Sequence, residues 1–585
     1  MKKSGYKKNY TDRIGAFVLT LLLFVATYFC FGMYYRLNDD VLIRDYISGI
    51  YSGTPSGHTV YMLYPLGALI AGLYRILPFV PWYGILMLAL VALCVYLITL
   101  RILSFQETKL QKTLAILSSA LFYAAFILKQ VTFLHYTVTG GLLMMTACFL
   151  FLTGPSAKNN RDFIKGNIIP IILSCISFFI RPQIGLFLLP MLAVSGLLRY
   201  SLDRQNEKYG CSFMKRYLPV FLIAAFIMGA GFLTDRLSYG DTEWREFKEF
   251  NGIRTELYDY NSIPDYAQNQ SFYEEAGITK MQVTLLKNYN YELDGSIDSA
   301  LIEKINAYND SRRASLTARL KQTAYEYVHR VLGTEDAPYN YIVIALYVLA
   351  SGLLLAARRG RTLLPLILLG VTRSVLFCYL LFRGRMTDRI TEPLLLCEMM
   401  ILTALILYVL LQKKWNVRVP MLLVVSLLLA FAGITSVPKV KESAATYEEN
   451  AAEWMKLQED LMRTTGEDFY IIDVYSSVKY SERIFDEAHL HRLSEMAGGG
   501  GNGRNNEIAG GWAVFSPLMY EKHENYGFRD AYSALRDLDR VRFVVNTEDE
   551  AEWLSELYRL SGDEITLSAQ RVTGDFTVYK VDKKS

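Results

Sequence analysis

The chain has 585 residues and a mass of 66.7 kDa, with 52% hydrophobic residues, 20% charged residues and a mean hydropathy of +0.19. Its length would suggest about four soluble domains of ~150 residues each. The distribution of charge excludes that arrangement, because residues 236–339 and 437–585 hold 75 of the 118 Asp, Glu, Lys and Arg residues. The net charge of +4, without a basic run interleaved with aromatic residues, gives no reason to expect a nucleic-acid partner.

The N-terminal segment is basic and leads into a long apolar run at residues 14–35. This run is too long for the core of a signal peptide, and no small-residue cleavage site follows it. It predicts an uncleaved first span with its N-terminus in the cytoplasm.

The remaining apolar runs have about the length that crosses a ~30 Å hydrocarbon core. Residues 60–77 are ambiguous, because they contain Pro65, two glycines and Arg75. Treating them as an interfacial helix places every short basic loop in the cytoplasm, as the positive-inside rule requires. Eleven spans are therefore predicted, with an even count as the main alternative, near residues 14–35, 82–103, 113–130, 134–153, 166–181, 183–199, 217–235, 340–357, 362–382, 390–411 and 418–436.

This topology places the polar segments outside the cytoplasm. The first loop, 36–81, should carry two surface-lying helices, and the second large loop should be mainly helical. Strand-like segments near the C-terminus indicate a small α/β domain. The predicted fold is a polytopic α-helical membrane protein divided into an N-terminal membrane region (1–235), a helical extracytoplasmic loop region (236–339), C-terminal spans (340–436) and an extracytoplasmic α/β domain (437–585).

An acidic pair, Asp39 and Asp40, follows the first span within the sequence Arg-Leu-Asn-Asp-Asp. Adjacent carboxylates at a membrane boundary can serve as a general base or bind a divalent cation. The alternative is structural: Asn38 or Asp39 caps the next helix, and Asp40 complements the dipole of that helix.

The acidic pair directly outside the first span, the loop with surface helices, the many-span bundle and the external C-terminal domain resemble the GT-C class of membrane glycosyltransferases. The resemblance covers the architecture of residues 1–436, and Asp39-Asp40 is its only sequence motif. It implies transfer of a sugar from a polyprenyl-phosphate carrier to an envelope acceptor. It also implies that Asp39 or Asp40 deprotonates the acceptor or holds a metal.

Four arginines are expected on the outer face. The implied reaction releases an anionic lipid phosphate at the membrane surface, so cations should face it, and arginine offers a planar fork for phosphate oxygens. A triple-arginine turn outside the cell also departs from the positive-inside rule. The alternative is binding to anionic lipid headgroups. The candidate lipid-phosphate ligands are Arg181, Arg383, Arg385 and Arg389.

Two further charges, Arg373 and Glu398, lie within predicted spans. At a rise of ~1.5 Å per residue, both lie roughly 14 Å below the outer face. A lone charge at that depth costs at least ~2.5–3.5 kcal/mol. The sequence therefore predicts that the two form a structural intramembrane pair between sequential helices.

Several residues on the outer face are candidates for substrate binding. His58 lies in the first loop, and His135 and Tyr136 lie near the outer end of the fourth span. Trp244 and Arg245 begin a segment rich in aromatic and charged residues, which suits stacking on sugars. The alternatives are satisfied polar histidines and an aromatic belt at the membrane interface.

The function expected from these features is that of a glycosyltransferase in the cell membrane of a bacterium. Its partners would be the lipid bilayer, a polyprenyl-phosphate-linked sugar and an envelope glycan, lipid or protein acceptor. The cofactor is open, with a divalent cation at Asp39 and Asp40 as one option. Two other functions stay open: a transporter or flippase for a lipid-linked glycan, and a non-catalytic envelope-binding membrane protein.

Overall fold

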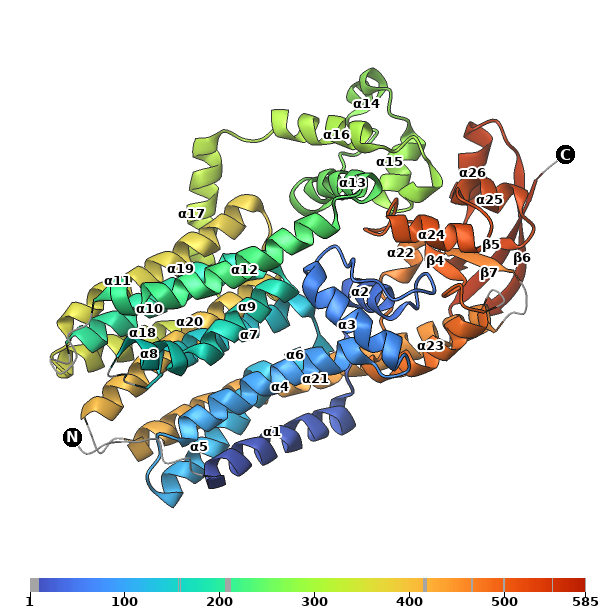
Figure 1. Ribbon diagram of the computed structural model, residues 1–585. Helices are drawn as coiled ribbons and strands as arrows, with labels where there is room; N and C mark the ends of the chain where they lie inside the picture. Colours follow the sequence, from blue (N-terminus) through green and yellow to red (C-terminus); the bar gives the residue numbers. More distant parts are fainter. Residues whose placement is uncertain are drawn as a thin grey trace.

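The computed structural model describes residues 10–583 apart from 156, 158, 206–211, 414–417, 464–466, 498–499 and 550, so most of the basic N-terminal segment lies outside it. A bundle of long helices forms one end of the molecule, and a region containing a β-sheet forms the other (Figure 1). The helices α2 (Asn38–Ser48) and α3 (Tyr64–Ile76) lie between them.

Within the described residues, nine helices are long and apolar enough to cross a membrane, or ten if one bent pair forms a single span. This composition is consistent with a polytopic helical membrane protein. The nine are α1 (Tyr10–Phe31), α4 (Trp82–Leu103), the run of α5 (Lys109–Phe122), the π-helix η1 (Tyr123–Ile127) and α6 (Leu128–Thr132), α10 (Pro182–Arg204), α12 (Leu218–Ser238), α18 (Tyr339–Ala356), η3 (Gly360–Thr362) with α19 (Leu363–Arg383), α20 (Asp388–Lys413) and α21 (Arg418–Met462).

Two of the eleven predicted spans coincide with less regular helices. The bent pair is α8 (Asn160–Gly166) and α9 (Ile168–Ile180), whose axes differ by 50°. Helix α7 (Tyr136–Leu152) has only 17 residues, all of them buried. Because a helix that is apolar on every side can be either a span or a buried core helix, the count of eleven stays a prediction.

The first predicted span ends earlier than expected. Gly32, with φ of +74°, terminates α1, and Tyr34–Tyr35 (β1) pairs in parallel with Phe133–Leu134 (β2). The ambiguous segment at 60–77 forms the 13-residue helix α3. At ~1.5 Å per residue this helix is about 20 Å long, too short for a ~30 Å core.

The first loop contains the two predicted helices, and α2 is largely buried within the protein. Seven of its 11 residues are buried, because α2 lies between the bundle and the sheet region (Figure 1). Asp39 and Asp40 occupy its first turn, where carboxylates complement the helix dipole. Its N-cap is Leu37, which forms no side-chain cap, so the capping role considered for Asn38 or Asp39 is wrong.

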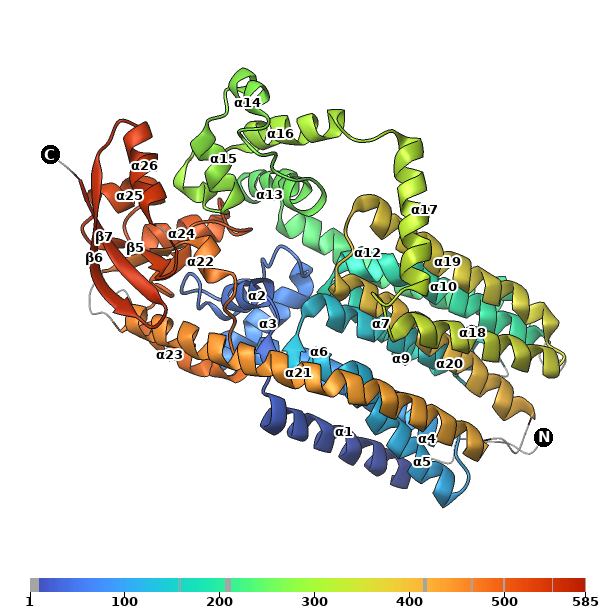
Figure 2. The ribbon, with the colours of Figure 1, turned by 180° about the vertical axis from the view of Figure 1, so that it is seen from behind.

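The second large loop is helical, as expected. Helix α17 contacts α19 of the bundle, and α13 packs on α16. Figure 2 shows α17 connecting the bundle to the outer helices. The elements are α13 (Thr242–Tyr260), α14 (Gln270–Ala276), α15 (Lys280–Lys287), η2 (Tyr291–Leu293), α16 (Ser299–Ser311) and α17 (Leu316–Leu332), and the short α11 (Phe213–Arg216) lies before α12.

Helix α21 runs unbroken from the bundle to the sheet (Figures 1 and 2), and the expected domain boundary at 436/437 falls inside it. The sheet has the order β4-β3-β5-β7-β6. The strands β4, β3 and β5 are parallel to one another, and β7 runs antiparallel to both of its neighbours, β5 and β6. The elements are β3 (Phe469–Ile472), α22 (Val474–Ser477), η4 (Ile484–Asp486), α23 (Glu487–Met496), β4 (Asn506–Ile508), α24 (Pro517–Asn525), α25 (Ala531–Asp537), β5 (Val541–Asn546), α26 (Glu552–Leu560), β6 (Ile565–Thr573) and β7 (Phe576–Lys583).

Candidate functional site

A cavity of about 410 Å³ contains all four arginines that the sequence singled out. Arg181 lies between α9 and α10 in extended conformation. Arg383 ends α19, where Gly384 adopts a φ of +69° and turns the chain toward Arg385. Arg389 lies in the first turn of α20. Among the described side chains that line this arginine cavity there is no carboxylate.

The remaining walls of the arginine cavity are largely apolar. Ile184, Leu186 and Phe187 come from α10, and Tyr379 and Leu380 come from α19. Leu186 and Tyr379 are 57% and 53% exposed, so they face the surroundings of the bundle. The cavity therefore combines four cations with an apolar flank.

Helix α13 covers part of the arginine cavity with counter-charges outside the lining. Arg383 Nη2 lies 3.3 Å from Glu256 Oε2, and Arg385 pairs with Asp259. The ring of Tyr260 lies 3.9 Å from the Arg383 guanidinium carbon. Arg383 Nε is buried and has no hydrogen-bond partner within the described residues.

Arg181 is held by aromatic rings. Its guanidinium carbon lies 4.5 Å from the ring centre of Tyr61 and 5.2 Å from that of Tyr136, a geometry favourable for cation–π attraction. Its Nη1 atom has no hydrogen-bond partner among the described residues. Tyr136, predicted to bind substrate, lines the arginine cavity beside Arg181.

The structure separates the two adjacent aspartates. Asp39 is partly exposed, accepts a 3.0 Å hydrogen bond from the Trp512 indole, and lies 3.6 Å from Arg389 Nη1. Asp40 is fully buried and accepts hydrogen bonds from the Tyr83 hydroxyl at 2.7 Å and the Tyr136 backbone N–H at 3.0 Å. Burial raises the pKa of Asp40 to about 8. Asp40 therefore joins α2 to α4 and α7, and Asp39 is the carboxylate available for chemistry.

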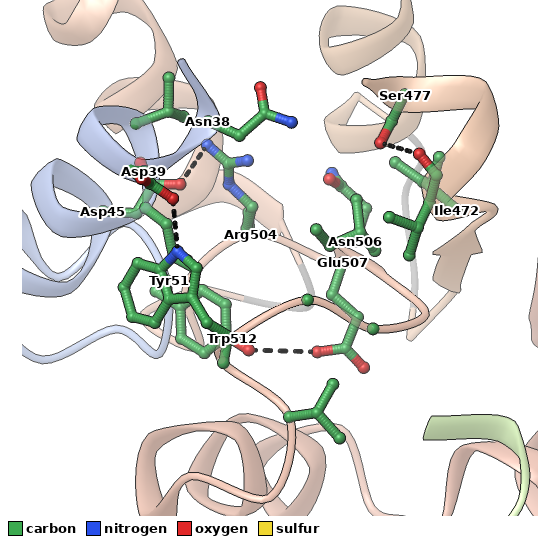
Figure 3. Close-up of a pocket in the computed structure, with 18 of the residues that line it drawn as sticks. Asn38, Asp39, Asp45, Tyr51, Ile472, Ser477, Arg504, Asn506, Glu507 and Trp512 are labelled. Carbon is green, nitrogen blue, oxygen red and sulfur yellow. Dashed lines mark hydrogen bonds and ion pairs between the residues drawn. The ribbon is translucent and has the colours of Figure 1, made fainter. Parts of the chain in front are cut away.

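A second cavity, of about 170 Å³, has Asp39 in its lining (Figure 3). We call it the interface cavity, because residues from α2, such as Asn38, line one wall and residues from the sheet region, such as Asn506 and Trp512, line the other. Trp454 of α21 also lines it.

A buried set of charges joins the two walls of the interface cavity. Arg44 Nη2 of α2 lies 2.7 Å from Asp45 and 2.5 Å from Glu482. Arg504 Nη2, from the segment before β4, lies 2.8 Å from Asp45. Burial alone would raise the pKa of Glu482, but Arg44 and Arg504 outweigh that effect and lower it. Two arginines and two carboxylates thus form a balanced network between the first loop and the sheet region.

The surroundings of Asp39 do not fit a divalent cation. Its oxygens face an indole N–H and a guanidinium, whereas such cations prefer several oxygen ligands. A different trio, Glu292, Glu507 and His523, brings its ligand atoms within 4.8 Å of one another. There Glu507 and Glu292 outweigh burial and raise the pKa of His523 to about 9. Lys522 Nζ also lies 3.8 Å from Glu507, so this trio already has its counter-charges.

The other predicted substrate ligands lie elsewhere. His58 stacks on Trp244, with ring centres 4.5 Å apart, and its Nε2 atom lies 3.0 Å from the Ser238 carbonyl oxygen. Trp244 is buried, so neither an exposed stacking platform nor an interfacial belt describes it. His135 caps α7 by accepting from the Thr137 N–H. Arg245 is exposed on α13.

The predicted ion pair between Arg373 and Glu398 is present. Arg373 Nε lies 3.0 Å from Glu398 Oε2, and the Tyr347 hydroxyl donates to Glu398 Oε1 at 2.7 Å. The pair joins α19 and α20, and Tyr347 extends it to α18. None of the three residues lines either cavity, which fits a structural role.

Sequence reasoning missed the contribution of the sheet region, above all Trp512 and Asn506. A local signal existed in the Gly-Gly-Trp sequence that ends at Trp512. A Cβ atom on Gly510 would lie 1.6 Å from the Tyr289 carbonyl oxygen, so this close approach requires glycine.

Comparison of the chain with protein-family models, curated proteins and solved structures finds no match.

Proposed function

We propose that the chain is a membrane glycosyltransferase that moves a sugar from a polyprenyl-phosphate donor to a cell-envelope acceptor. The observation that carries the proposal is the arginine cavity with its apolar flank. The proposal includes a bacterial cell membrane, eleven spans, a cytoplasmic N-terminus, and catalysis on the outer side beside the extracytoplasmic sheet region.

The arginine cavity suits both parts of a lipid phosphate, the anionic phosphate group and the apolar prenyl chain. Guanidinium groups bind phosphate oxygens through charge-assisted hydrogen bonds. The exposed side chains of Leu186 and Tyr379 offer an apolar path for the prenyl chain at the edge of the bundle. An aqueous sugar nucleotide would gain nothing from that apolar flank, so the cavity favours a lipid-linked donor.

In the proposed reaction, Asp39 is the general base. It takes the proton of an acceptor hydroxyl as the acceptor oxygen bonds to the anomeric carbon of the donor sugar. The bond between that carbon and the phosphate oxygen breaks, and both of its electrons leave with the polyprenyl phosphate. Arg389, which lies 3.6 Å from Asp39, would help to stabilise the charge that develops on the leaving phosphate.

The test is transfer of radiolabelled sugar from total polyprenyl lipids to envelope fractions, with wild-type and variant proteins at equal abundance. Asp39→Asn should lower transfer by ~10²–10⁴-fold, the usual contribution of a general base. Asp40→Asn should retain most of it, because Asp40 is buried behind Tyr83 and Tyr136. Full activity of Asp39→Asn would reject the base, and absence of transfer from every lipid donor would reject the function.

A further inference from the structure

We infer that the interface cavity is the acceptor subsite and that it takes a neutral, hydroxyl-rich sugar ring. This inference rests on the proposed function and adds the chemical class of the acceptor. Four observations carry it: the position of Asp39, a buried amide without a partner, the charge of the walls and the volume of the cavity.

Asp39 stands between the two cavities. It lines the interface cavity, and its Oδ2 atom lies 3.6 Å from Arg389, which lines the arginine cavity. The Trp512 indole donates to Oδ1 at 3.0 Å and so fixes the carboxylate at this boundary. A hydroxyl in the interface cavity can therefore approach Asp39, and Asp39 in turn contacts an arginine of the arginine cavity.

The polar groups in the walls suit sugar hydroxyls. Asn506 is 1% exposed and lines the interface cavity, and its Nδ2 atom has no hydrogen-bond partner among the described residues. A buried amide N–H without a partner is unfavourable in the empty protein, and a ligand oxygen would satisfy it. Trp454 and Trp512 add aromatic faces, which pack against the apolar face of a sugar ring.

The charge of the walls excludes an anionic acceptor. Asp39, Glu292 and Glu507 line the cavity together with the paired Asp45 and Glu482. Arg504, the one arginine among the described residues of the lining, is already 2.8 Å from Asp45. No described cation in this lining is therefore free to bind an acceptor phosphate or carboxylate, whereas neutral hydroxyls can donate to the carboxylate oxygens.

The volume favours one sugar ring. The cavity measures about 170 Å³, below the roughly 300–1,000 Å³ of pockets that bury drug-sized ligands. Asn38 is exposed at the α2 wall of the cavity, so the rest of a longer glycan can continue into solvent there. The acceptor would thus enter by a terminal or branch residue.

Binding can be measured without any transfer. The full-length protein in lipid nanodiscs is titrated with neutral methyl glycosides of glucose, galactose, mannose and N-acetylglucosamine, and tryptophan fluorescence reports occupancy beside Trp454 and Trp512. At least one neutral glycoside should bind, and glucuronate and glucose 6-phosphate should bind at least tenfold more weakly. Asn506→Leu should weaken binding at least tenfold, and Asn38→Ala about threefold.

The neighbouring Asn505 provides the matched control. Its Nδ2 atom donates to the carbonyl oxygens of Leu461 and Asp468, so Asn505→Leu should lower the melting temperature but leave glycoside binding unchanged. Asn506→Leu should keep or raise the melting temperature, because the amide it removes has no partner at Nδ2.

Three outcomes would overturn the inference: no neutral glycoside binds, the anionic sugars bind better, or Asn506→Leu and Asn38→Ala both bind as the wild type does. The sugar-transfer assay separates this inference from the proposed function. Transfer without glycoside binding would reject the subsite alone. Glycoside binding that depends on Asn506, without transfer from any polyprenyl lipid, would support the ligand class and reject the enzymatic function.

Discussion

Two groups of arginines lie close to Asp39, and they differ in how their charges are balanced. Arg44 and Arg504 are 0% and 9% exposed and share Asp45 and Glu482 within the interface between α2 and the sheet region. The arginine cavity holds four arginines in its lining without a carboxylate among its described side chains. The first group has two carboxylates for two arginines, and the second has three carboxylates, all outside the lining, for four arginines.

This difference in charge balance suits the first group to stabilising the fold and the second group to binding an anion. A buried charge without compensation is strongly unfavourable, so the balanced network stabilises one arrangement of α2 against the sheet region. In the arginine cavity, three arginines pair with carboxylates of α13 and with Asp39, all of which lie outside the lining, and Arg181 is held by aromatic rings. An incoming anion can therefore bind there without first displacing a complete set of ion pairs.

The largest effect should come from breaking the balanced network. Glu482→Gln removes a carboxylate that Arg44 and Arg504 share, and unfolding should become easier by about 3–5 kcal/mol. Glu256→Gln, the same change beside Arg383 of the arginine cavity, should cost less than about 1 kcal/mol because that pair is partly exposed. Denaturation of the two variants in detergent compares them. Equal effects would mean that the two groups of arginines do not differ.

The Arg373–Glu398 pair is separate from the balanced network but is also a buried ion pair, so removing one partner should likewise lower the stability of the fold. Glu398→Gln and Arg373→Met should each lower the folded yield, since a lone intramembrane charge costs at least ~2.5–3.5 kcal/mol. The double variant should recover part of the loss. A double-mutant cycle on thermal stability gives the coupling energy, and simple additivity would show that the pair contributes none.

The arginine cavity should respond in activity rather than in stability. Arg385→Gln should lower transfer from the polyprenyl donor by about 10–100-fold, because a hydrogen bond to a charged group contributes roughly 1.5–3 kcal/mol. Arg559→Gln, at an exposed arginine of α26 that pairs with Glu556, is the matched control and should leave transfer unchanged. A loss of melting temperature in Arg385→Gln as large as that in Glu482→Gln would contradict the comparison.

Asp40 gives a smaller, pH-dependent effect that separates it from Asp39. Folded Asp40 keeps its proton up to about pH 8, whereas an unfolded Asp loses it near pH ~4. Between these values the folded state binds more protons, so wild-type stability falls as pH rises, by up to about 1.4 kcal/mol per pH unit.

The Asn side chain of the Asp40→Asn variant cannot ionise, so the variant should lack the fall in stability with rising pH that the Asp40 carboxyl causes. Melting temperatures of the two proteins should be closest near pH 5, and the wild type should fall below the variant as the pH approaches 9. Glu487, whose pKa burial also raises to about 8, is present in both proteins and cancels in the difference. A constant difference across this range would show that Asp40 is ionised in the folded protein.

Much of the bundle could be predicted from hydropathy, since each predicted span coincides with a helix. The four arginines that the sequence grouped together also line one cavity, because each lies at or next to a helix end; their role in binding phosphate stays a prediction. Helix α7 shows the limit, since its 17 buried residues have the same local pattern as a short span.

The sequence could not predict that Asp40 is buried while Asp39 is accessible, because this difference depends on contacts with Tyr83, Tyr136 and Trp512. The Asp39–Trp512 contact joins residues 473 positions apart, and such a pair leaves no periodic signal in either segment. The same holds for the interface cavity, whose two walls come from opposite ends of the chain. Local pattern thus identified the acidic motif, and tertiary packing decided which carboxylate is accessible.

The continuity of α21 has a mechanical consequence. Its 45 residues extend from the bundle to the sheet region without a break, roughly 65 Å at ~1.5 Å per residue. Trp454, near its far end, donates to Glu482 of the balanced network at 3.1 Å. One continuous helix, whose first half is apolar enough to cross a membrane, therefore joins the bundle to the buried charges beside the sheet region. If α21 spans the bilayer, as we propose, a change in bilayer thickness that tilts this helix should also change the distance between Trp512 and Asp39.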